Sequence, residues 1–518
     1  SSPDRTQTTP NHVPQVTRHP PQARPSPRPT RPHPTHTAAA PASHATDTRT
    51  GIISPLRPRA HRPQRVPTHQ QCVSPPDSRT ISRSILQNAR KRADMLRVNP
   101  LKALRPTTEA AERVASVPYD VVDRDEAARL AEGNPLSFLH VVRPDIDLPP
   151  DTDPYSDPVY QTAKNNLERL VADGALFRDD TPCVYVYRQT MTLQTAKGPR
   201  ELSQIGVVAC CHIDDYSNDV IKKHEKTRQA KEDDRTRHVL TLNANAGPVF
   251  LLHKDDDNLK RLIEANSAGE PLYDFTAPDR VRHTVWRVEE YAPFIAAYKK
   301  LDAAYVADGH HRSASAARAG AQRRNENPEH TGHEEYNWFL TALFPASELN
   351  ILPYNRFVKD LNRLTPDQLI NKLSAVARVE KDMDPEPRDT GCFGMYLAGQ
   401  WYSVTLPDPS INKADPIASL DYELLYERIL KPILGIGDIR TDERIDFVGG
   451  IRGTDELKRR VDQSIADDPN NIGGVAFAMH PVTIQQLVAI ADAGEIMPPK
   501  STWFEPKLRS GLLVHELD

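Results

Sequence analysis

From Met95 onward, apolar residues occur in short blocks whose spacing separates strands from helices. Continuous apolar runs predict buried strands, and they cover residues 184–187, 205–211, 248–253, 283–288, 338–344 and 474–479. Apolar positions spaced by three and four residues predict helices, and they cover residues 160–172, 257–265, 292–301 and 483–493. Because strands and helices alternate along the chain, the pattern indicates an α/β protein of mixed type.

Three further segments have less regular patterns. Residues 101–120 are predicted to be a short strand region, and residues 138–142 a strand between a turn and Pro144. The charged segment 219–240 is predicted to form one long helix, with positions 224, 227, 228, 231 and 235 on one face. A solvated helix face is the simplest explanation of such a charge run, and a cationic face over a ligand site is the alternative.

The spacing of the elements changes near residue 346. Thr365 and Pro366 predict the start of a helix, short strands follow at 393–396 and 401–405, and a helix at 420–434 precedes Gly435. We therefore expect three parts, which are residues 1–94, a domain of residues 95–345, and a smaller α+β domain of residues 346–518.

The last segment, residues 497–511, combines two aromatic residues with several cations and prolines. Such a composition is not typical of a disordered end, so the segment is expected to dock against the main body of the protein. Lys500 or Arg509 would then reach a ligand, or the docking would serve the structure alone.

Residues 1–94 differ in composition from the rest of the chain. They hold 14 Arg, one Lys, four Asp and no Glu, a net charge of +11, which leaves −15 for the remainder of a chain whose total is −4. They also hold 17 of the 47 prolines and no aromatic residue. Such a segment buries too little apolar surface to offset its ordering entropy, so we expect a disordered extension. An Arg-rich organelle presequence and a basic nucleic-acid arm are the alternatives.

Cysteine spacing and hydropathy limit the cellular setting. The five cysteines show neither a zinc-ligand spacing nor a C-x-x-C pair, which fits a reducing cytosol. No apolar run approaches the length of about 18 residues that a membrane helix needs. We therefore expect a cytoplasmic protein with no membrane partner. The charge of −15 outside residues 1–94 also opposes non-specific nucleic-acid binding.

The densest group of polar residues follows the apolar strand 303–306. Asp308 and Gly309 predict a turn, after which a helix begins with His310, His311, Arg312 and Ser313. Such a turn binds anions, because the free N–H groups and the dipole of the helix both point at the ligand. Arg312 would add a planar fork matched to phosphate, and Asp308 could hold a metal ion or orient a hydroxyl. A simple Asp-Gly turn beside two buried, hydrogen-bonded histidines is the alternative.

Several motifs from about Leu96 to the end of the chain resemble one family. They occupy residues 117–120, 134–138, 224–227, 231–235, 307–312, 434–436, 444–450 and 497–511. On these motifs the chain is identified as a member of the domain of unknown function family 1015. Its Asp-Gly-His-His-Arg turn is similar to the nucleotide-phosphate turn of the ParB/sulfiredoxin-like superfamily, which includes kinases of free serine, CTP-hydrolysing partition proteins and sulfiredoxin. The resemblance implies a core of that type within residues 95–345.

Two of these classes fit poorly. Sulfiredoxin has a catalytic cysteine within its turn, whereas residues 309–312 contain none. Partition proteins carry a helix-turn-helix after the turn, and the sequence shows no convincing one. The kinases resemble this chain in the order of parts, although roughly 50 residues are inserted here between the strand and the turn. Those parts would be His224-Glu225, Arg235, the strand 248–250 and the turn 308–312.

The resemblance thus implies a nucleotide-dependent kinase that acts on the hydroxyl of a small metabolite such as free serine. The alternative is a CTP-type nucleotide-binding regulatory or partition-like module without metabolite turnover. For the kinase, the implied catalytic residues are Glu225, Asp308, His310 and His311, with Glu232 as the substitute for Glu225 as general base. The nucleotide, ATP or ADP with CTP left open, would bind Gly309, Arg312, Ser313, Lys231 and Arg235. Asp308 would hold Mg²⁺, and a homodimer is left open.

Overall fold

The structure is a computed structural model that describes most of the chain after residue 94. The described residues are 95–195, 198–407, 412, 414–468, 470 and 472–518. The predicted disordered extension, residues 1–94, lies outside the described residues.

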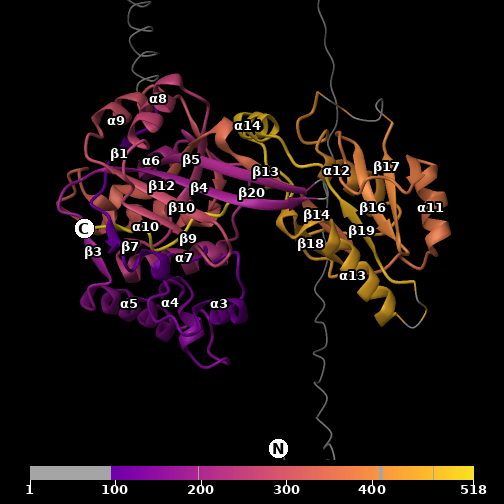
Figure 1. Cartoon of the computed structure of the whole chain (residues 1–518), viewed down its shortest axis with the longest axis horizontal. Coiled ribbons are helices and arrows are strands. Elements are labelled where there is room, and N and C mark those ends of the chain that lie inside the picture. The colour runs from indigo at the N-terminus through magenta and orange to yellow at the C-terminus, as the bar shows by residue number, and fades with distance from the viewer. Residues whose placement is uncertain (1–94, 196–197, 408–411, 413, 469, 471) are drawn as a thin grey trace, which may run out of the picture. The chain divides into compact units, whose positions relative to one another are not determined.

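A nine-stranded sheet forms the first part of the described chain (Figure 1). Strand β11 runs parallel to β6 and β12 runs parallel to β8, while the other neighbours are antiparallel, so the sheet is mixed. Across the sheet the strands are β6 (Ile221–Lys222), β11 (Ala304–Asp308), β8 (Val249–His253), β12 (Trp338–Pro345), β5 (Gly198–His212), β4 (Val184–Thr195), β10 (Arg282–Val288) and β9 (Tyr273–Thr276), with β1 (Val98–Asn99) paired to β5.

Both faces of this sheet are covered, which explains why its central strands are continuously apolar. Along β4, Val184 and Val186 belong to one buried cluster, whereas Tyr185 and Tyr187 belong to another. Successive side chains of a strand point to opposite faces. The alternation therefore places one hydrophobic cluster on each face of the sheet.

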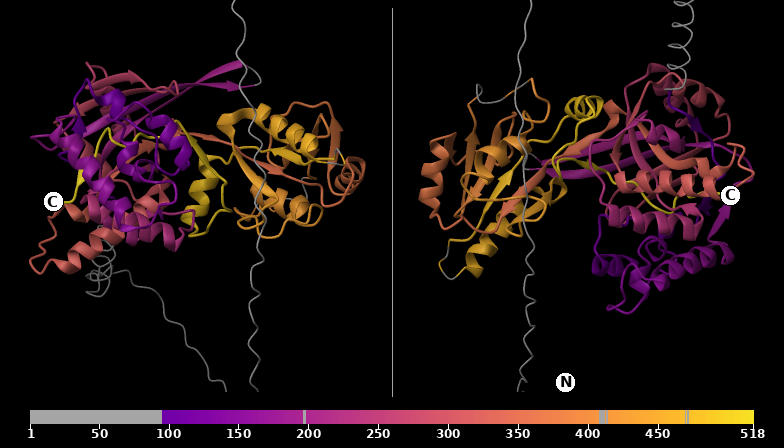
Figure 2. Two further views of the ribbon diagram at one scale, coloured as in Figure 1. Left: turned by 90° about the horizontal axis from the view of Figure 1, so that it is seen from below. Right: turned by 180° about the vertical axis from the view of Figure 1, so that it is seen from behind.

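Helices supply most of the cover of the first cluster. Helices α8 and α9 pack their apolar residues against it, and α10 lies against α7, which in turn lies against α5 (Figure 1, Figure 2). The helices of this part are α2 (Ala111–Val114), α3 (Arg124–Ala131), α4 (Leu139–Val142), α5 (Asp157–Ala172), α6 (Ile213–Ser217), α7 (Gln229–Leu242), α8 (Asp257–Asn266), α9 (Ala292–Tyr298) and α10 (His310–Glu326).

A second sheet of six strands follows, and all its neighbours are antiparallel. In order the strands are β15 (Arg378–Lys381), β17 (Gln400–Thr405), β16 (Cys392–Leu397), β19 (Val475–Ala478), β14 (Tyr354–Val358) and β18 (Ile445–Gly449). The later helices are α11 (Pro366–Ser374), α12 (Asp421–Leu425), which continues as a π-helical turn, α13 (Gly453–Asp467) and α14 (Ile484–Asp492). A large mixed sheet and an antiparallel one confirm the predicted mixed α/β class.

The last residues of the chain form two short strand pairs with earlier segments. Strand β20 (Trp503–Glu505) pairs with β13 (Asn350–Leu352), and β21 (His515–Glu516) pairs with β7 (Ala244–Asn245). The remaining short pair is β2 (Leu104–Pro106) with β3 (Leu176–Arg178). Backbone hydrogen bonds therefore join the C-terminal residues to segments that lie far from them in the sequence.

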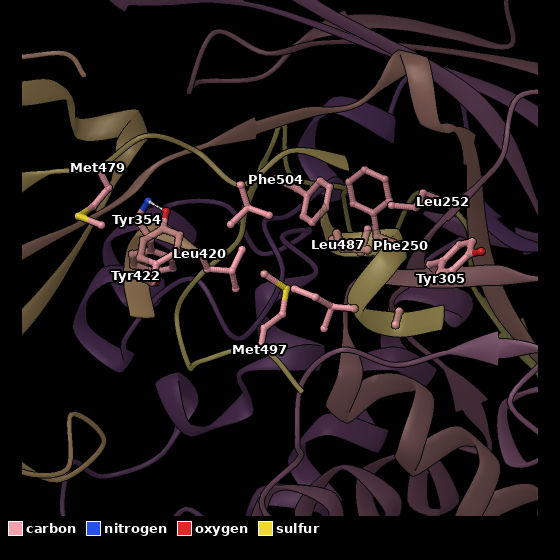
Figure 3. Close-up of a cluster of buried hydrophobic side chains, with 14 of the residues drawn as sticks. Phe250, Leu252, Tyr305, Tyr354, Leu420, Tyr422, Met479, Leu487, Met497 and Phe504 are labelled. Carbon is pink, nitrogen blue, oxygen red and sulfur yellow. Dashed lines mark hydrogen bonds between the residues drawn. The ribbon is translucent and has the colours of Figure 1, made fainter. Parts of the chain in front are cut away.

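One hydrophobic cluster joins side chains from both sheets. Figure 3 shows Phe250 of β8 near one end, Tyr354 of β14 near the other, and Met497 and Phe504 between them. The ring centroids of Phe250 and Phe504 are 5.6 Å apart. Both phenylalanine side chains are about 1% exposed. The final segment thus fills the apolar core instead of lying on top of it.

Two secondary-structure predictions were wrong. Residues 138–142 form a helical turn, because a short apolar run buried on all sides fits a helix as well as a strand. Only the second half of the predicted helix 219–240 is helical: Val220 and Ile221 are buried at the sheet edge, and α7 begins at Gln229. The predicted common face of positions 224 to 235 therefore does not exist.

A smaller correction concerns residues 101–120, which contain a three-residue strand and a helical turn instead of the predicted short strand region alone. In contrast, the predicted helix start at Thr365 is confirmed, since its side chain accepts a hydrogen bond from the Gln368 N–H in a capping box.

The packing of the last segment predicts a large cost for Phe504→Ala. Deleting a buried phenyl ring leaves a cavity, so we expect a loss of about 3–5 kcal/mol in the free energy of unfolding, measured by urea denaturation. Phe177→Ala is the matched control, because this ring is 39% exposed under the guanidinium of Arg105 and should cost about 1 kcal/mol or less. Equal losses in the two variants would contradict the packing of Phe504 in the core.

Candidate active site

The candidate site lies where strand β11 passes into helix α10. The strand ends at Asp308, Gly309 has a φ of 94°, and the helix begins at His310. Such a left-handed φ strains any residue with a side chain, and a Cβ at Gly309 would lie 3.1 Å from the guanidinium carbon of Arg312. The predicted order of strand, glycine turn and helix is confirmed. The turn leaves the first N–H groups of a 17-residue helix at the end of the sheet.

The guanidinium of Arg312 folds back onto this turn and is held by three groups. It donates a hydrogen bond to Asp308 Oδ2 at 3.1 Å and another to the carbonyl of Pro248, and it lies 3.6 Å from Asp120 Oδ2. Only about 10% of its side chain is exposed. The planar fork predicted to bind phosphate is thus already bound to protein oxygens on at least two of its nitrogens.

Asp308 is the carboxylate at the centre of the turn. Besides Arg312, the ammonium of Lys507 lies 3.7 Å from its Oδ2. Burial alone would raise the pKa of Asp308, but the cations Lys507 and Arg312, together with His310, hold this pKa well below its usual range. Asp308 therefore stays ionised throughout the physiological pH range. Its side chain is 28% exposed, so the charge is accessible.

Two buried histidines stand side by side at the start of the helix. The rings of His224 and His310 meet edge to face with centroids 4.5 Å apart. Neither ring nitrogen of His224, nor Nε2 of His310, makes a well-formed hydrogen bond to the described residues. Burial lowers the pKa of His224 to about 4, against the opposing effect of Asp308. Burial, assisted by His224, also lowers the pKa of His310 well below its usual value, so both rings are neutral at pH 7.

Glu225 is the second carboxylate of the site. It lies in the loop before α7, where its Oε2 is 4.0 Å from Nδ1 of His310, and 42% of its side chain is exposed. Burial raises the pKa of Glu225, with Asp308 acting in the same direction and Lys500 opposing it. A half-buried carboxylate with a raised pKa beside a neutral imidazole is typical of a general base.

The other residues predicted for the site have structural contacts. His311 Nε2 accepts a hydrogen bond from the Arg228 N–H at 3.2 Å, and Ser313 Oγ donates to the carbonyls of Gly309 and His310. These contacts fix the loop before α7 and the first turn of α10.

The site residues predicted on helix α7 have partners of their own. Arg235 pairs with Asp234 at 2.9 Å and lies over the ring of Tyr119. Lys231 lies 5.6 Å from the ring centroid of Tyr155. Glu232 accepts a hydrogen bond from Thr227 and pairs with Arg318 at 3.3 Å. Glu225 therefore stands nearest to the turn, and Glu232 has its own structural partners.

Two residues of the site were missed by the sequence analysis, although both lie in motifs that it named. Asp120 ends the motif 117–120 and lies beside Arg312, and Lys507 belongs to the final segment. Their spacing from the turn, more than 180 residues in each direction, gives no local signal of contact. Only the family motifs could have pointed to them.

A small cavity lies beside Arg312. Its volume is about 40 Å³, room for a few water molecules but not for a nucleotide. The residues that line it include Tyr119, Arg235, His238, Asn245, Arg312 and Ser510 among apolar neighbours, and most of the lining surface is apolar. Nε of Arg312 is buried and makes no hydrogen bond to the described residues.

These features define a mixed α/β protein with a charged strand–turn–helix site. The chain belongs to the family described as proteins of unknown function, DUF1015, whose model matches residues 98–423, more than half of the sequence. The resemblance found in its motifs is thereby confirmed. A comparison with curated proteins finds no match.

Among solved structures, the chain is similar to a free serine kinase in complex with AMP and to a C-terminally truncated SbnI from Staphylococcus aureus. The identities are 14% and 10%, with TM-scores of 0.28 and 0.32. The first match covers 57% of this chain and 89% of the kinase, and the second covers 60% and 87%. In the described part of the chain no helix is long and apolar enough to cross a membrane.

The buried histidines predict a pH-dependent stability. The pKa of His224 falls from 6.5 in the unfolded chain to about 4 in the folded protein, so the unfolded chain binds the proton more tightly and stability is lost as the pH falls through this window. Between pH 7.5 and pH 5 this group alone should remove about 2 kcal/mol of the free energy of unfolding. His224→Phe should reduce the pH dependence by that amount in urea denaturation.

His333→Phe serves as the control for this measurement. His333 is exposed, so its replacement should leave the pH dependence of stability unchanged. An unaltered pH dependence in His224→Phe would show that His224 is not neutral and buried in the folded protein.

Proposed function

We propose that this protein is a nucleotide-dependent phosphotransferase that phosphorylates the hydroxyl of a small metabolite such as free serine. One observation carries the proposal: two carboxylates flank the N-terminus of α10, Asp308 with a pKa held well below its usual range and Glu225 with a raised pKa. A helix N-terminus favours phosphate. Phosphoryl transfer also needs a cation that neutralises the phosphate charge and a base for the acceptor hydroxyl. Asp308 would hold the cation as a metal ion, and Glu225 would be the base.

In the proposed reaction Glu225 takes the proton of the acceptor hydroxyl. The hydroxyl oxygen forms a bond to the terminal phosphorus of the nucleotide, and the bond from that phosphorus to the bridging oxygen breaks. The nucleotide leaves with one phosphate fewer, and the proton remains on Glu225 until it passes to solvent. The exposed fraction of Glu225 gives the acceptor and solvent access to the carboxylate. Nε2 of His310 is buried and has no hydrogen-bond partner among the described residues.

Asp308 fits one position in the coordination of Mg²⁺. The described residues contain no group of three or more His, Cys, Asp or Glu side chains that could hold a metal ion. Mg²⁺ often takes one or two carboxylates together with phosphate oxygens, and both ion-pair contacts of Asp308 are made by Oδ2, which leaves Oδ1 for a cation. When bound with the nucleotide, Mg²⁺ would neutralise charge on the phosphates.

The proposal also covers the nucleotide, the type of core and the second domain. The nucleotide would be held by residues of the first sheet, with the adenine nucleotides ATP and ADP and also CTP as donors to test. The core that carries the turn would be of the ParB/sulfiredoxin-like type, within residues 95–345. Residues 346–518 would form the second domain, and their final segment would close the site.

Glu225→Gln should strongly lower turnover without preventing nucleotide binding. Loss of a general base lowers kcat by about 10²- to 10⁴-fold, measured as nucleoside diphosphate released when hydroxy amino acids are added to ATP. The affinity for ATP should stay within about twofold, because an amide keeps the size of the side chain. Glu232→Gln is the control, and it should keep its turnover, because Glu232 is tied to Thr227 and Arg318.

Two results would contradict the proposed function or the role of Glu225 in it. Wild-type protein that binds or hydrolyses a nucleotide without any response to a hydroxylated metabolite would favour a regulatory nucleotide-binding module. Equal turnover in Glu225→Gln and the wild type would remove Glu225 from the reaction.

Asp308→Asn separates the role of the metal ion from that of the phosphate site. With Mg²⁺, the wild type should bind ATP about tenfold or more tightly than the variant, a difference of about 1.4 kcal/mol. In EDTA the variant should bind ATP as tightly as the wild type or more tightly, because the substitution removes a negative charge beside the phosphates. Calorimetric titration in the two buffers measures both affinities. A variant that is weaker by the same factor in both buffers would exclude Mg²⁺ from Asp308.

A further inference from the structure

The segment that follows strand β20 is anchored from the centre of the first sheet. The side-chain amide of Gln189 on β4 donates to the carbonyl of Lys507 at 2.7 Å, and that of Gln204 on β5 donates to the carbonyl of Pro506 at 3.0 Å. The two glutamines are direct neighbours in the strand register, and Gln204 also donates to Gln189 at 2.9 Å. Both side chains are fully buried. Two buried amides therefore hold two successive peptide carbonyls.

This anchoring directs the side chain of Lys507 to the turn. Its ammonium lies 4.9 Å from the ring centroid of Trp503 and 3.7 Å from Asp308 Oδ2. About 13% of the side chain is exposed. An N–O distance of 3.7 Å is longer than a hydrogen bond. The ammonium therefore pairs with Asp308 through its charge, without a hydrogen bond to that carboxylate.

Arg312 differs from Lys507 in this respect. Its guanidinium already donates to Asp308 and to Pro248, with Asp120 close by. An anion at the N-terminus of α10 would have to displace these partners to use the two terminal nitrogens of the guanidinium, and the third nitrogen, Nε, is buried. Lys507 offers a positive charge at the same place, held to Asp308 by an ion pair that is longer than a hydrogen bond, and lysine binds phosphate as a point charge.

We propose that Lys507 is the cation that contacts the phosphates of a nucleotide bound at the turn, and that Gln189 and Gln204 are positioning residues for it. The inference rests on the proposed function, because it names the phosphate contact of the same site. Arg312 then has a structural task, which is to hold the turn between its two carboxylates.

The test compares Lys507→Met with Lys507→Arg and with Lys254→Met on the full chain. Lys254 is a 68% exposed lysine paired with Asp492, outside the site. Calorimetric titrations use ATP, inorganic pyrophosphate and adenosine as probes. We expect Lys507→Met to bind ATP and pyrophosphate about tenfold or more weakly than the wild type, with adenosine binding and the unfolding temperature unchanged. Lys507→Arg should regain most of the affinity, and Lys254→Met should behave as the wild type.

The outcomes separate this inference from the proposed function. Wild-type affinity for both phosphate probes in Lys507→Met would overturn the role of Lys507 and leave the phosphotransferase standing. A wild type that binds neither ATP nor pyrophosphate would overturn both. A loss of affinity for adenosine equal to that for ATP would also overturn the role of Lys507, since it would indicate a general disturbance of the structure.

A double-mutant cycle tests the positioning role of Gln189. Gln189→Leu should weaken pyrophosphate binding about threefold or more in the wild-type background. In Lys507→Met it should have no further effect, because the ammonium that it positions is gone. Equal effects of Gln189→Leu in both backgrounds would overturn positioning. If Gln189→Leu does not fold, Gln204→Leu completes the same cycle and is judged by the same comparison.

Discussion

A guanidinium that is taken out of water needs compensating charge, and at Arg312 this need organises the site. The compensation comes from three separate parts of the chain: Asp308 on the same turn, Asp120 near the start of the described chain, and the carbonyl of Pro248 before β8. Breaking such a buried pair would leave an uncompensated charge, which costs several kcal/mol. The charge of this one side chain therefore links the turn, the motif 117–120 and the start of strand β8.

The final segment applies a second constraint of a different kind. Phe504 and Met497 fill the apolar space between side chains of the two sheets, while the backbone a few residues later is held by buried glutamine amides. Apolar packing is tolerant of small shifts, but hydrogen bonds to fixed carbonyls are directional. The combination brings a lysine from the end of the chain to the turn in a defined position.

The sequence predicted the local features well and the long-range ones poorly. Strands such as 248–253 and the turn at Asp308-Gly309 have patterns that depend only on neighbouring residues. The segment 219–240 failed because its charges suit a helix, whereas the burial of Ile221 at the edge of a sheet decided the outcome. The contacts of Arg312 with Asp120, and of Lys507 with Asp308, join residues far apart in sequence, and no local pattern contains that information.

The same reasoning explains how burial and charge set the protonation of four groups of the site, which are His224, His310, Asp308 and Glu225. A free imidazole titrates close to pH 6.5. Burial lowers the pKa of both imidazoles and keeps both neutral at pH 7, and the cations around Asp308 keep that carboxylate ionised. Among these four groups only Glu225 has a pKa that its surroundings raise. Its surroundings therefore favour a bound proton, whereas those of the other three groups favour the unprotonated form.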